Sequence, residues 1–432
     1  MSKQATHQSR RDFLKTSALA TGAALGSVPL VNVLAGETAR KFRVGLIGCG
    51  GRGNGAMSDH LEAAKYLNEK LGWNLQIEPV AMGDWFLGKA KSAGKRYGVP
   101  EEHCFGGGDC YKKVLERNPD IVLMAQPPVF RPVHFEAVIK AGKHVFFEKP
   151  SAVDPPGVRR ILKAGEMAGQ KNLCVVAGTQ RRHDKGYNDR AREIQDGARG
   201  RIVAGRVAWN QGAIFTNRPI NAKSPDDLCG PWTIWAEMSG DHIVEQHCHN
   251  LDIANWYLGA HPVSAGGFGF RARRKAGNMY DFFSVDLEYP NGVHIHSMCR
   301  QMADTWTWVG EDFVYEKEKP ADFKFQTPDP YEQVGYTKSP YISEHAHLLY
   351  AIVLGKPHNE TQNVAWATGA AILGREAAYT GKRMVWAEMF EDATKNPSVY
   401  NLQMKPTAED FETGDVKLLK DGDIRIPGAE AV

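Results

Sequence analysis

A glycine-rich run, GCGGRG at residues 48–53, constrains the fold of this 432-residue chain more than any other feature. It directly follows a short β-prone segment, Phe42 to Ile47, and the residues after it favour a helix. In a dinucleotide-binding βαβ unit, Gly48 would allow the tight turn, Gly50 would let the backbone approach a pyrophosphate, and Gly53 would let helix and strand pack closely. Because a short glycine pattern also occurs in flexible turns, the prediction depends on the segments that follow.

An acidic residue stands where such a unit needs one. Residues 76–83 (QIEPVAMG) predict a second strand, and Asp84 follows it directly. A carboxylate at that point accepts hydrogen bonds from a ribose diol and disfavours a 2′-phosphate, so we predict NAD rather than NADP as the cofactor. The interval from Gly53 to Asp84 exceeds the usual spacing of about 20 residues. We attribute the excess to a longer helix and loop over Glu62 to Asn74.

Two further predicted strands end in polar tails. Residues 120–125 run into Gln126-Pro127-Pro128, and residues 143–147 run into Glu148-Lys149-Pro150. Because ligands of open parallel sheets sit beyond the carboxyl ends of the strands, both tails are expected to face one crevice. Helical patterns alternate with these strands. The alternation predicts an α/β domain with a doubly wound parallel sheet, a Rossmann domain, over residues 40–180.

The pattern changes after residue 180. Period-two alternation predicts longer strands of a large, mostly antiparallel sheet, at Arg201 to Gln211, Val263 to Arg274, Asp281 to Tyr289 and Gly292 to Arg300. Residues 181–432 are therefore expected to form a C-terminal α+β domain for substrate binding and oligomerisation. The last helices of this domain can pack back on the Rossmann domain.

Three segments resemble the Gfo/Idh/MocA oxidoreductases, the family of glucose-fructose oxidoreductase and inositol dehydrogenase. They are the glycine-rich run, HFEAVIKAGKHVFFEKP at 134–150 and HNLDIANWYLGAHP at 249–262, and the similarity extends from Lys41 to the end of the chain. The resemblance implies that Lys149 lies against the nicotinamide and a substrate hydroxyl and helps a proton leave while hydride departs. A lysine at a strand end in a cofactor crevice is partly desolvated and near a positive ring, so we expect its pKa to be lowered.

A second motif, SGDHIVEQHCHNLDIANWYLG at 239–259, supplies an imidazole and carboxylates. On one helix Glu245, His249 and Asp252 share a face, which suits polyol binding and proton transfer. The family usually has Asp at the first of these positions, and the longer Glu245 favours a hydrogen-bonding role. His247 stands where the family often has glycine, which predicts an altered substrate pocket.

The predicted site residues come from these segments and from the junction between the domains. The predicted catalytic residues are Lys149, His249 and Glu245. The predicted cofactor-binding residues are Gly48, Gly50, Gly53, Arg52, Asp84, Pro127, Glu148 and Lys149. The predicted substrate-binding residues are Arg181, Arg182, His183 and Asp252. For the first three of these, a basic linker without a binding role is the alternative.

A metal site is an alternative use of the histidines around Glu245. The potential ligands are His242, His247, Cys248 and His249. On one helix, the last three of these point about 100° apart and do not converge. The sequence also has no HExxH motif and no CxxC pair, so we predict no metal.

The first 35 residues differ from the rest of the chain. Ser9-Arg10-Arg11-Asp12-Phe13-Leu14-Lys15 precedes an apolar stretch rich in Ala and Gly, which ends at Val33-Leu34-Ala35. This order resembles a twin-arginine (Tat) export signal and predicts a periplasmic or otherwise exported protein. The seven cysteines are dispersed, which argues against a disulfide framework. Such a set fits a protein that folds in the reducing cytoplasm and is exported afterwards.

The composition of the chain narrows the classes of molecule that it is expected to bind. The formal net charge is +3 and 24% of the residues are charged, so no charge excess indicates nucleic acid or a membrane surface. Beyond the signal, no stretch reaches the roughly 18 apolar residues of a membrane span. We expect a small carbohydrate substrate and a homodimer or homotetramer.

Together these patterns predict an exported NAD-dependent oxidoreductase that acts on a sugar or polyol. We expect the cofactor to be tightly bound, because export removes the protein from the soluble NAD pool. Two alternatives stay open. One is an enzyme that cleaves a glycoside, or eliminates a group from a sugar, through transient oxidation by NAD. The other is a non-catalytic sugar-binding protein on the same fold.

Overall fold

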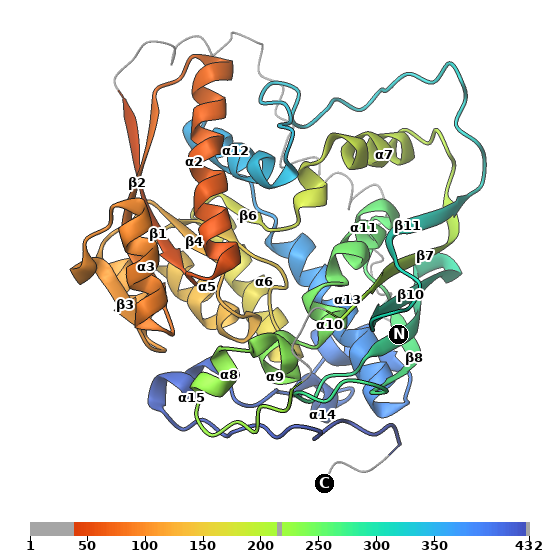
Figure 1. Ribbon diagram of the computed structural model, residues 1–432. Coiled ribbons are helices and arrows are strands. Elements are labelled where there is room, and N and C mark those ends of the chain that lie inside the picture. The colour runs from red at the N-terminus through yellow and green to blue at the C-terminus, as the bar shows by residue number, and fades with distance from the viewer. Residues whose placement is uncertain (1–38, 214–217, 429–432) are drawn as a thin grey trace, which may run out of the picture.

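The computed structural model describes residues 39–213 and 218–428. These residues form two units, each built on its own six-stranded sheet (Figure 1). The predicted export signal at residues 1–35 lies outside the described residues. Within the described ranges, no helix is long and apolar enough to cross a membrane.

The first sheet is parallel and has the strand order β3-β2-β1-β4-β5-β6. Its strands are β1 (Arg40–Ile47), β2 (Leu75–Asp84), β3 (Cys104–Gly106), β4 (Ile121–Met124), β5 (His144–Phe147) and β6 (Val175–Ala177). The chain starts in the middle, winds to one edge and then to the other, which confirms the predicted doubly wound fold. Ile47, Met124 and Phe147 lie side by side in register, so the segments after β1, β4 and β5 meet at one edge.

Helices cover both faces of this sheet (Figure 1). They are α2 (Gly51–Leu71), α3 (Leu87–Tyr97), α4 (Cys110–Glu116), α5 (Arg131–Lys140), α6 (Pro155–Gln170) and α12 (Pro340–Val353). Helices α2, α3 and α12 pack on one face, and α4, α5 and α6 pack on the other. Side chains of β4 alternate between these layers, so Leu123 contacts the first and Val122 the second. The late helix α12 therefore completes the core of the first unit.

The second sheet has the order β11-β7-β10-β9-β8-β12. Its strands are β7 (Ile202–Gln211), β8 (Ser264–Phe270), β9 (Phe282–Tyr289), β10 (Val293–Gln301), β11 (Trp308–Tyr315) and β12 (Met384–Val385). Neighbouring strands are antiparallel except β7 and β10, which are parallel. The predicted mostly antiparallel sheet is confirmed, and β11 and β12 extend it beyond the four predicted strands.

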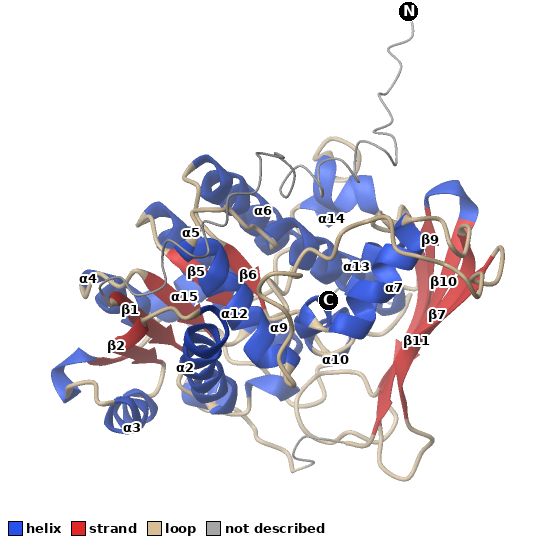
Figure 2. Ribbon diagram, turned by 90° about the horizontal axis from the view of Figure 1, so that it is seen from above, coloured by secondary structure: helices blue, strands red, loops and turns tan. Residues whose placement is uncertain are grey.

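Helices fill the space between the two sheets, as the view from above shows (Figure 2). Helices α10 (His242–Glu245), α11 (Cys248–Leu258) and α13 (Thr361–Thr380) pack on the inner face of the second sheet. The remaining α-helices of the described ranges are α7 (Lys185–Gln195), α8 (Asp226–Cys229), α9 (Ala236–Ser239), α14 (Pro397–Tyr400) and α15 (Ala408–Thr413). A π-helix spans Ala387–Glu391, and a 3₁₀ turn spans Gln180–His183.

The prediction that one helix carries Glu245, His249 and Asp252 is wrong. Helix α10 ends at Glu245, and α11 begins at Cys248 after a turn. His247, in this turn, is fully buried, and its Nε2 lies 2.8 Å from the hydroxyl oxygen of Ser297. His247 is therefore a core residue, and its predicted effect on the substrate pocket stays a prediction.

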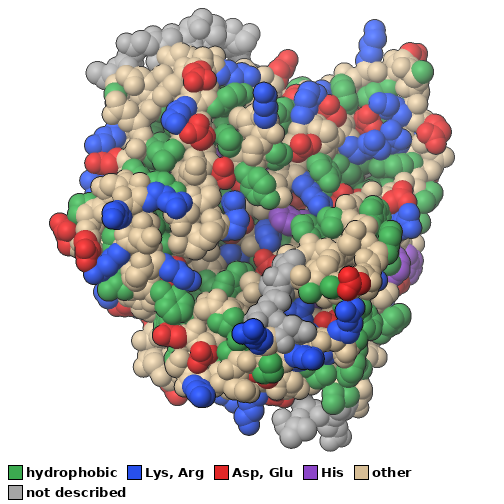
Figure 3. Space-filling view, viewed as in Figure 1, with side chains coloured by type: hydrophobic (Ala, Val, Ile, Leu, Met, Phe, Trp, Pro, Cys, Tyr) green, Lys and Arg blue, Asp and Glu red, His purple; other side chains and the backbone are tan. Residues whose placement is uncertain are grey.

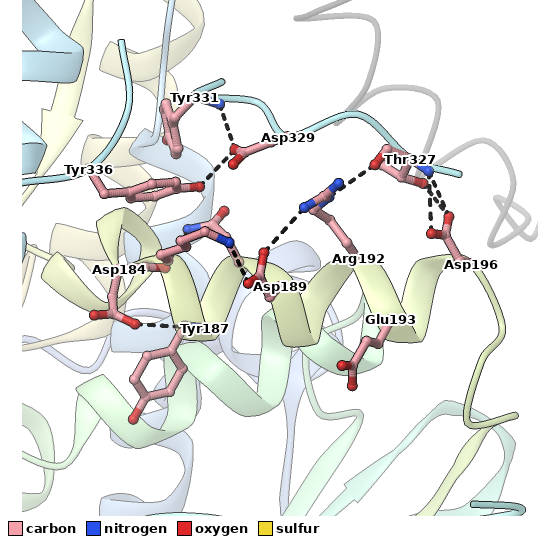
Figure 4. Close-up of polar contacts among 12 residues, drawn as sticks. Asp184, Tyr187, Asp189, Arg192, Glu193, Asp196, Thr327, Asp329, Tyr331 and Tyr336 are labelled. Atoms are coloured by element: carbon pink, nitrogen blue, oxygen red, sulfur yellow. Dashed lines mark hydrogen bonds and ion pairs between the residues drawn. The ribbon is translucent and has the colours of Figure 1, made fainter. Parts of the chain in front are cut away.

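A long connection, residues 316–339, joins β11 to α12 and crosses helix α7 (Figure 4). Thr327 in this connection donates its hydroxyl to the carboxylate of Asp196, at 2.6 Å. Arg192 Nε donates to the carbonyl oxygen of Thr327 at 2.9 Å. These contacts hold α7, and with it Tyr187, beside the inner face of the second sheet.

Candidate active site

The glycine-rich loop is tight against the first sheet and open on its other side. Gly48 has a φ of +90°, which favours glycine, and a Cβ there would lie 2.3 Å from the backbone nitrogen of Gln126. A Cβ on Gly53 would lie 1.7 Å from the carbonyl oxygen of Gly48. A Cβ on Gly50 or Gly51 would meet nothing within 4 Å. The loop therefore forms an open cradle of the kind that a pyrophosphate needs, at the N-terminus of α2.

Asp84 holds this loop from the end of β2. Its Oδ2 accepts the N–H of Cys49 at 2.8 Å, and its Oδ1 accepts the N–H of Phe86 at 2.9 Å. Burial raises the pKa of the Asp84 carboxyl, and these two hydrogen bonds oppose the rise. Each carboxylate oxygen keeps a second acceptor site, which a ribose diol can use.

A pocket with about 590 Å³ of empty space, open solvent included, lies at this edge of the sheet. Four predicted cofactor residues line it: Gly48, Gly50, Asp84 and Pro127. Two more lining residues, Gln126 and His134, are buried and carry polar atoms without a partner in the described structure, Gln126 Oε1 and His134 Nε2. The open cradle, the ribose acceptor and these unpartnered atoms fit a bound NAD.

The sequence did not single out Gln126 and His134. Gln126 stands in a predicted strand tail, which was a usable signal, whereas His134 is one polar residue in the helix α5. Arg131, also in α5, is buried and donates from Nη2 to the carbonyl oxygen of Gln126 at 2.7 Å and from Nη1 to that of Pro150. It thereby joins the two tails that follow β4 and β5.

Arg52 and Glu148 lie at the other end of the glycine loop. Arg52 Nε and Nη2 each lie 2.7 Å from Glu148 Oε1. The Arg52 guanidinium also lies 4.9 Å from the ring centre of Tyr341 on α12. These contacts fix the loop to the tail of β5, and a contact of either predicted residue with the cofactor stays a prediction.

Lys149 is buried and bonded to Glu245. Its Nζ donates to the backbone carbonyl of Glu245 and lies 3.2 Å from the Glu245 carboxylate. Burial by itself lowers the pKa of Lys149, but the negative charges around it, Glu245 foremost, outweigh burial and raise that pKa. The prediction of a lowered pKa is wrong, because it counted desolvation and omitted the carboxylate partner. Lys149 is therefore a protonated hydrogen-bond donor at neutral pH.

His249 is the unpaired polar group of this region. Its ring is 7% exposed and lies flat against Trp209 of β7, with ring centres 5.7 Å apart. Neither ring nitrogen bonds to another residue in the described part of the chain, in contrast to the bonded His247. Burial, together with the positive charges of Lys149 and Arg181, holds the pKa of His249 well below its usual value. The imidazole is therefore neutral at neutral pH and able to accept a proton.

Polar side chains from the second sheet complete the cleft near His249. Gln246 Oε1 accepts from Gln211 Nε2 at 3.2 Å and from Gln301 Nε2 at 2.6 Å. Arg181 pairs with Glu311 of β11, and its guanidinium lies 5.7 Å from the ring centre of Trp209. Amides, an ion pair and an indole side by side suit the hydroxyl groups and ring faces of a carbohydrate. Sequence reasoning missed Glu311, because the pattern of β11 does not indicate which cation its carboxylate meets.

Three predicted substrate residues are bonded to other residues at the domain junction. Arg182 and Asp252 are both buried and bond to each other, with Arg182 Nε 2.8 Å from Asp252 Oδ2. His183 is fully buried, and its Nδ1 lies 2.8 Å from Nδ1 of His347 on α12. These bonds fix the domain junction, and a contact of any of the three side chains with a substrate stays a prediction.

Most cations around the domain junction have a carboxylate partner. Four are paired: Lys149 with Glu245, Arg181 with Glu311, Arg182 with Asp252 and Arg52 with Glu148. The buried Arg131 instead donates to two backbone carbonyl oxygens. Figure 3 shows basic side chains and a histidine in the hollow between the two units. In the described ranges, no three His, Cys, Asp or Glu side chains are arranged to hold a metal ion.

These features define a class of protein: a Rossmann nucleotide-binding domain joined to an α+β domain, with a Lys–Glu pair and a neutral histidine at their junction. Two family models agree with this class. The NAD-binding Rossmann fold of the Gfo/Idh/MocA oxidoreductase family matches residues 42–178, and the GFO/IDH/MocA C-terminal domain matches residues 189–309. The two matches cover more than half of the chain, and the protein belongs to this family.

Relatives are found among inositol 2-dehydrogenases. That of Burkholderia cenocepacia (strain HI2424) is 29% identical over 258 residues, which is 59% of this chain and 66% of the relative. The match thus spans just under two thirds of the relative's length.

Solved structures share the fold at low identity. The aldose-aldose oxidoreductase from Caulobacter crescentus, complexed with glycerol, has a TM-score of 0.58 at 18% identity and covers 80% of this chain and all of its own. The scyllo-inositol dehydrogenase from Lactobacillus casei with bound NAD(H) and scyllo-inositol has a TM-score of 0.58 at 17% identity, covering 81% of this chain and all of its own. At this identity the likeness concerns the fold.

Proposed function

We propose that this protein is an exported oxidoreductase that uses resident NAD to oxidise a neutral sugar or polyol. One observation carries the proposal: a neutral imidazole without a hydrogen-bond partner, His249, stands near a protonated lysine that is fixed to a carboxylate. A bound nicotinamide would supply the hydride acceptor that this pair lacks. The relatives named as inositol 2-dehydrogenases act on a polyol, which supports the substrate class.

Each residue has a separate task in this proposal. His249 accepts the proton of the substrate hydroxyl, because its lowered pKa keeps it neutral. Lys149 donates a hydrogen bond to the same oxygen and stabilises the negative charge that develops there. Glu245 fixes the Lys149 ammonium and offers its other carboxylate oxygen to a neighbouring hydroxyl. Trp209 supports the flat face of His249 and keeps water from it.

The pairing of charges beside His249 favours a neutral substrate. A uronate or sugar phosphate would need an uncompensated cation next to its negative charge. Lys149 and Arg181 each have a carboxylate partner, and the buried Arg131 guanidinium is bonded to two backbone carbonyl oxygens. The amide cluster at Gln246 provides donors and acceptors for hydroxyl groups without a net charge.

We also propose export and self-association. Export rests on the twin-arginine pattern at residues 9–15, and it requires a cofactor that stays bound. Self-association rests on the outer face of the second sheet, where Phe268 of β8 and Val314 of β11 are 67% and 55% exposed. The same face also carries exposed charged side chains, such as Arg206 and Asp312. An exposed sheet face that mixes apolar and charged side chains suits pairing of two copies into a homodimer or homotetramer.

The test is nucleotide content followed by turnover. The full chain is expressed in a bacterium, purified from the exported fraction and unfolded, and the supernatant is assayed for NAD(H) and NADP(H). We expect about one NAD(H) per chain. No nucleotide, together with no binding of added NAD, would contradict the dehydrogenase mechanism.

Turnover then separates net oxidation from transient oxidation. The protein is mixed with myo-inositol or glucose, and absorbance at 340 nm is followed with added NAD. A steady rise indicates net oxidation. Release of a leaving group from an aryl glucoside without a steady rise would instead support a glycoside-cleaving enzyme that returns the hydride.

A further inference from the structure

The adenosine end of the nucleotide pocket is closed by residues that lie far from it in the sequence. In the pocket, Cys229 of α8 and Trp232 of the following turn face Trp85 and Phe86, which follow Asp84. Asp84 marks the ribose next to the adenine, so this end of the pocket lies away from Lys149 at the tail of β5. The second unit therefore contributes walls to a pocket that the Rossmann unit begins.

A hydrogen bond fixes this wall to the Rossmann unit. Trp85 Nε1 donates to Asp226 Oδ1 at 2.6 Å. Asp226 begins α8, and Cys229 ends it, so the bond sets the distance of Cys229 from the pocket. In this way one Asp–Trp contact joins the two units beside the site for adenosine.

The C-terminal segment packs on the same wall. Phe411 of α15 lies edge-on to Trp85 and to Phe130, with ring centres 5.3 and 5.0 Å apart. The backbone of α15 also approaches the pocket-lining Gly108, where a Cβ would lie 2.8 Å from the carbonyl oxygen of Phe411. Helix α15 therefore supports the aromatic wall from behind.

Asp421 ties the end of this segment back to the second unit. Its Oδ2 accepts the N–H groups of Ile220 and Asn221, each at 2.7 Å, and its Oδ1 accepts the N–H of Gly277 at 2.5 Å. The N–H of Gly422 adds a bond to the carbonyl oxygen of Gly277 at 2.8 Å. Hydrogen bonds to a carboxylate are about twice as strong as those between neutral groups. One side chain thus fixes two backbone groups at the start of the segment that carries Cys229 and Trp232, and ties them to Gly277 in the connection between β8 and β9.

We propose that residues 220–235 and 408–428 form a clasp over the adenosine half of the bound nucleotide, and that Asp421 is the positioning residue that keeps the clasp closed. This proposal rests on the proposed NAD binding, and it adds that the clasp slows the release of the bound nucleotide. NAD leaves only when Trp232 and Cys229 move away from Trp85 and Phe86. Loosening the clasp then speeds release of the adenosine half without changing contacts at Lys149.

The test compares two nucleotides on one variant. Asp421→Asn keeps the size of the side chain but turns one acceptor oxygen into an NH₂ group, which cannot accept a backbone N–H. Release of NADH is followed by the loss of energy transfer from protein tryptophans after excess NAD is added. Affinity for reduced nicotinamide mononucleotide, which lacks the adenosine half, is measured by fluorescence titration. We expect Asp421→Asn to release NADH at least tenfold faster and to bind the mononucleotide within twofold of the wild type.

Asp423→Asn is the matched control. Asp423 lies two residues further along, is exposed, and its carboxylate bonds to no residue in the described part of the chain. Its variant should release NADH at the wild-type rate. If Asp421→Asn lowers the melting temperature into the assay range, Asp226→Ala tests the same clasp from its other end.

The outcomes are distinct. Unchanged NADH release in both clasp variants would overturn the clasp while leaving NAD binding intact. An equal loss of affinity for NADH and for the mononucleotide would also overturn it, because general loosening would then explain the effect. A wild-type protein that binds neither nucleotide would instead refute the proposed function.

Discussion

The nucleotide pocket takes most of its residues from successive strand ends of one parallel sheet, whereas the proposed substrate cleft takes its residues from both units. Gly48, Asp84 and Gln126 follow or end β1, β2 and β4, so parallel pairing alone brings them together. In the cleft, Lys149 meets Glu245, which lies 96 residues further along the chain. The floor of the pocket is therefore set by one sheet, to which the second unit adds only Cys229 and Trp232, whereas the cleft depends on how the two units pack.

The pocket and the cleft also differ in how many of their charged and polar side chains are paired. The pocket offers backbone N–H groups, one carboxylate and two unpartnered polar atoms, Gln126 Oε1 and His134 Nε2. The cleft instead holds ion pairs and leaves His249 without a partner. A group left unpaired in a region where other groups are paired is the group most suited to meet a substrate.

The largest expected effect tests whether the catalytic residues lie in the cleft and not in the nucleotide pocket. Lys149→Met removes the ammonium that faces the reacting oxygen, and we expect kcat/KM to fall by about 10²–10⁴-fold. The amount of NAD(H) bound per chain should stay close to that of the wild type, because Lys149 does not line the adenosine pocket. Steady-state kinetics and nucleotide assays measure the two quantities.

Lys143→Met is the control, since Lys143 lies just before β5 and bonds to Asn118 outside the site. It should keep wild-type kinetics. Loss of both turnover and bound nucleotide in Lys149→Met would break the separation between the two regions.

The ion pair at the domain junction should be worth more to stability than an exposed one. Arg182→Met leaves the buried Asp252 carboxylate without a partner, so we expect the free energy of unfolding to fall by about 3–5 kcal/mol. Arg206→Met removes an exposed pair with Asp312 and should cost less than about 1 kcal/mol. Urea unfolding followed by tryptophan fluorescence measures both.

A double variant shows whether the unpaired Asp252 charge causes the loss of stability. Arg182→Met combined with Asp252→Leu removes both charges and should recover most of the loss. If it does not, packing rather than the unpaired charge explains the destabilisation.

The Rossmann sheet could be predicted from the sequence because each signal for it lies within a short segment of the chain. Strand, glycine loop and polar tail each occupy a few adjacent residues, and the rule for parallel sheets assigns their ends to one edge. The partner of Lys149 could not be predicted, because a lysine alone does not say which distant carboxylate it meets. That omission reversed the expected direction of the Lys149 pKa.

The helix break after Glu245 was missed for a related reason. Residues 242–258 have a helical pattern with no Gly or Pro between α10 and α11. The turn forms where His247 enters the core and bonds to Ser297 of β10, which is a tertiary contact. Burial of Arg182, Asp252 and His183 likewise depends on partners in other elements.

Substitutions in the glycine loop separate an effect on folding from an effect on NAD binding. Gly50→Ala places its Cβ in open space, so the protein should fold normally but bind NAD at least tenfold more weakly, because the methyl group enters the cradle. Gly53→Ala brings a Cβ within 1.7 Å of the Gly48 carbonyl oxygen and should also cost about 1–3 kcal/mol of stability. Gly51→Ala is the control and should leave stability unchanged. Isothermal titration with NAD and thermal unfolding report the two effects.

The smallest expected effect concerns pH, and it sharpens the role of the unpaired histidine in the cleft. An ordinary histidine with a pKa near 6.5 is about ten times less available as a base at pH 5.5 than at pH 7.5. Because burial and the charges of Lys149 and Arg181 lower the pKa of His249, the imidazole remains neutral as the pH falls through this window. The raised pKa of Lys149 keeps the ammonium protonated over the same window.

We therefore expect kcat/KM to change less than twofold between pH 5.5 and 7.5, with intact folding checked by fluorescence at each pH. A tenfold loss centred near pH 6.5 would mean that the base is a solvated group and that the dry contact between His249 and Trp209 is not kept in the working enzyme.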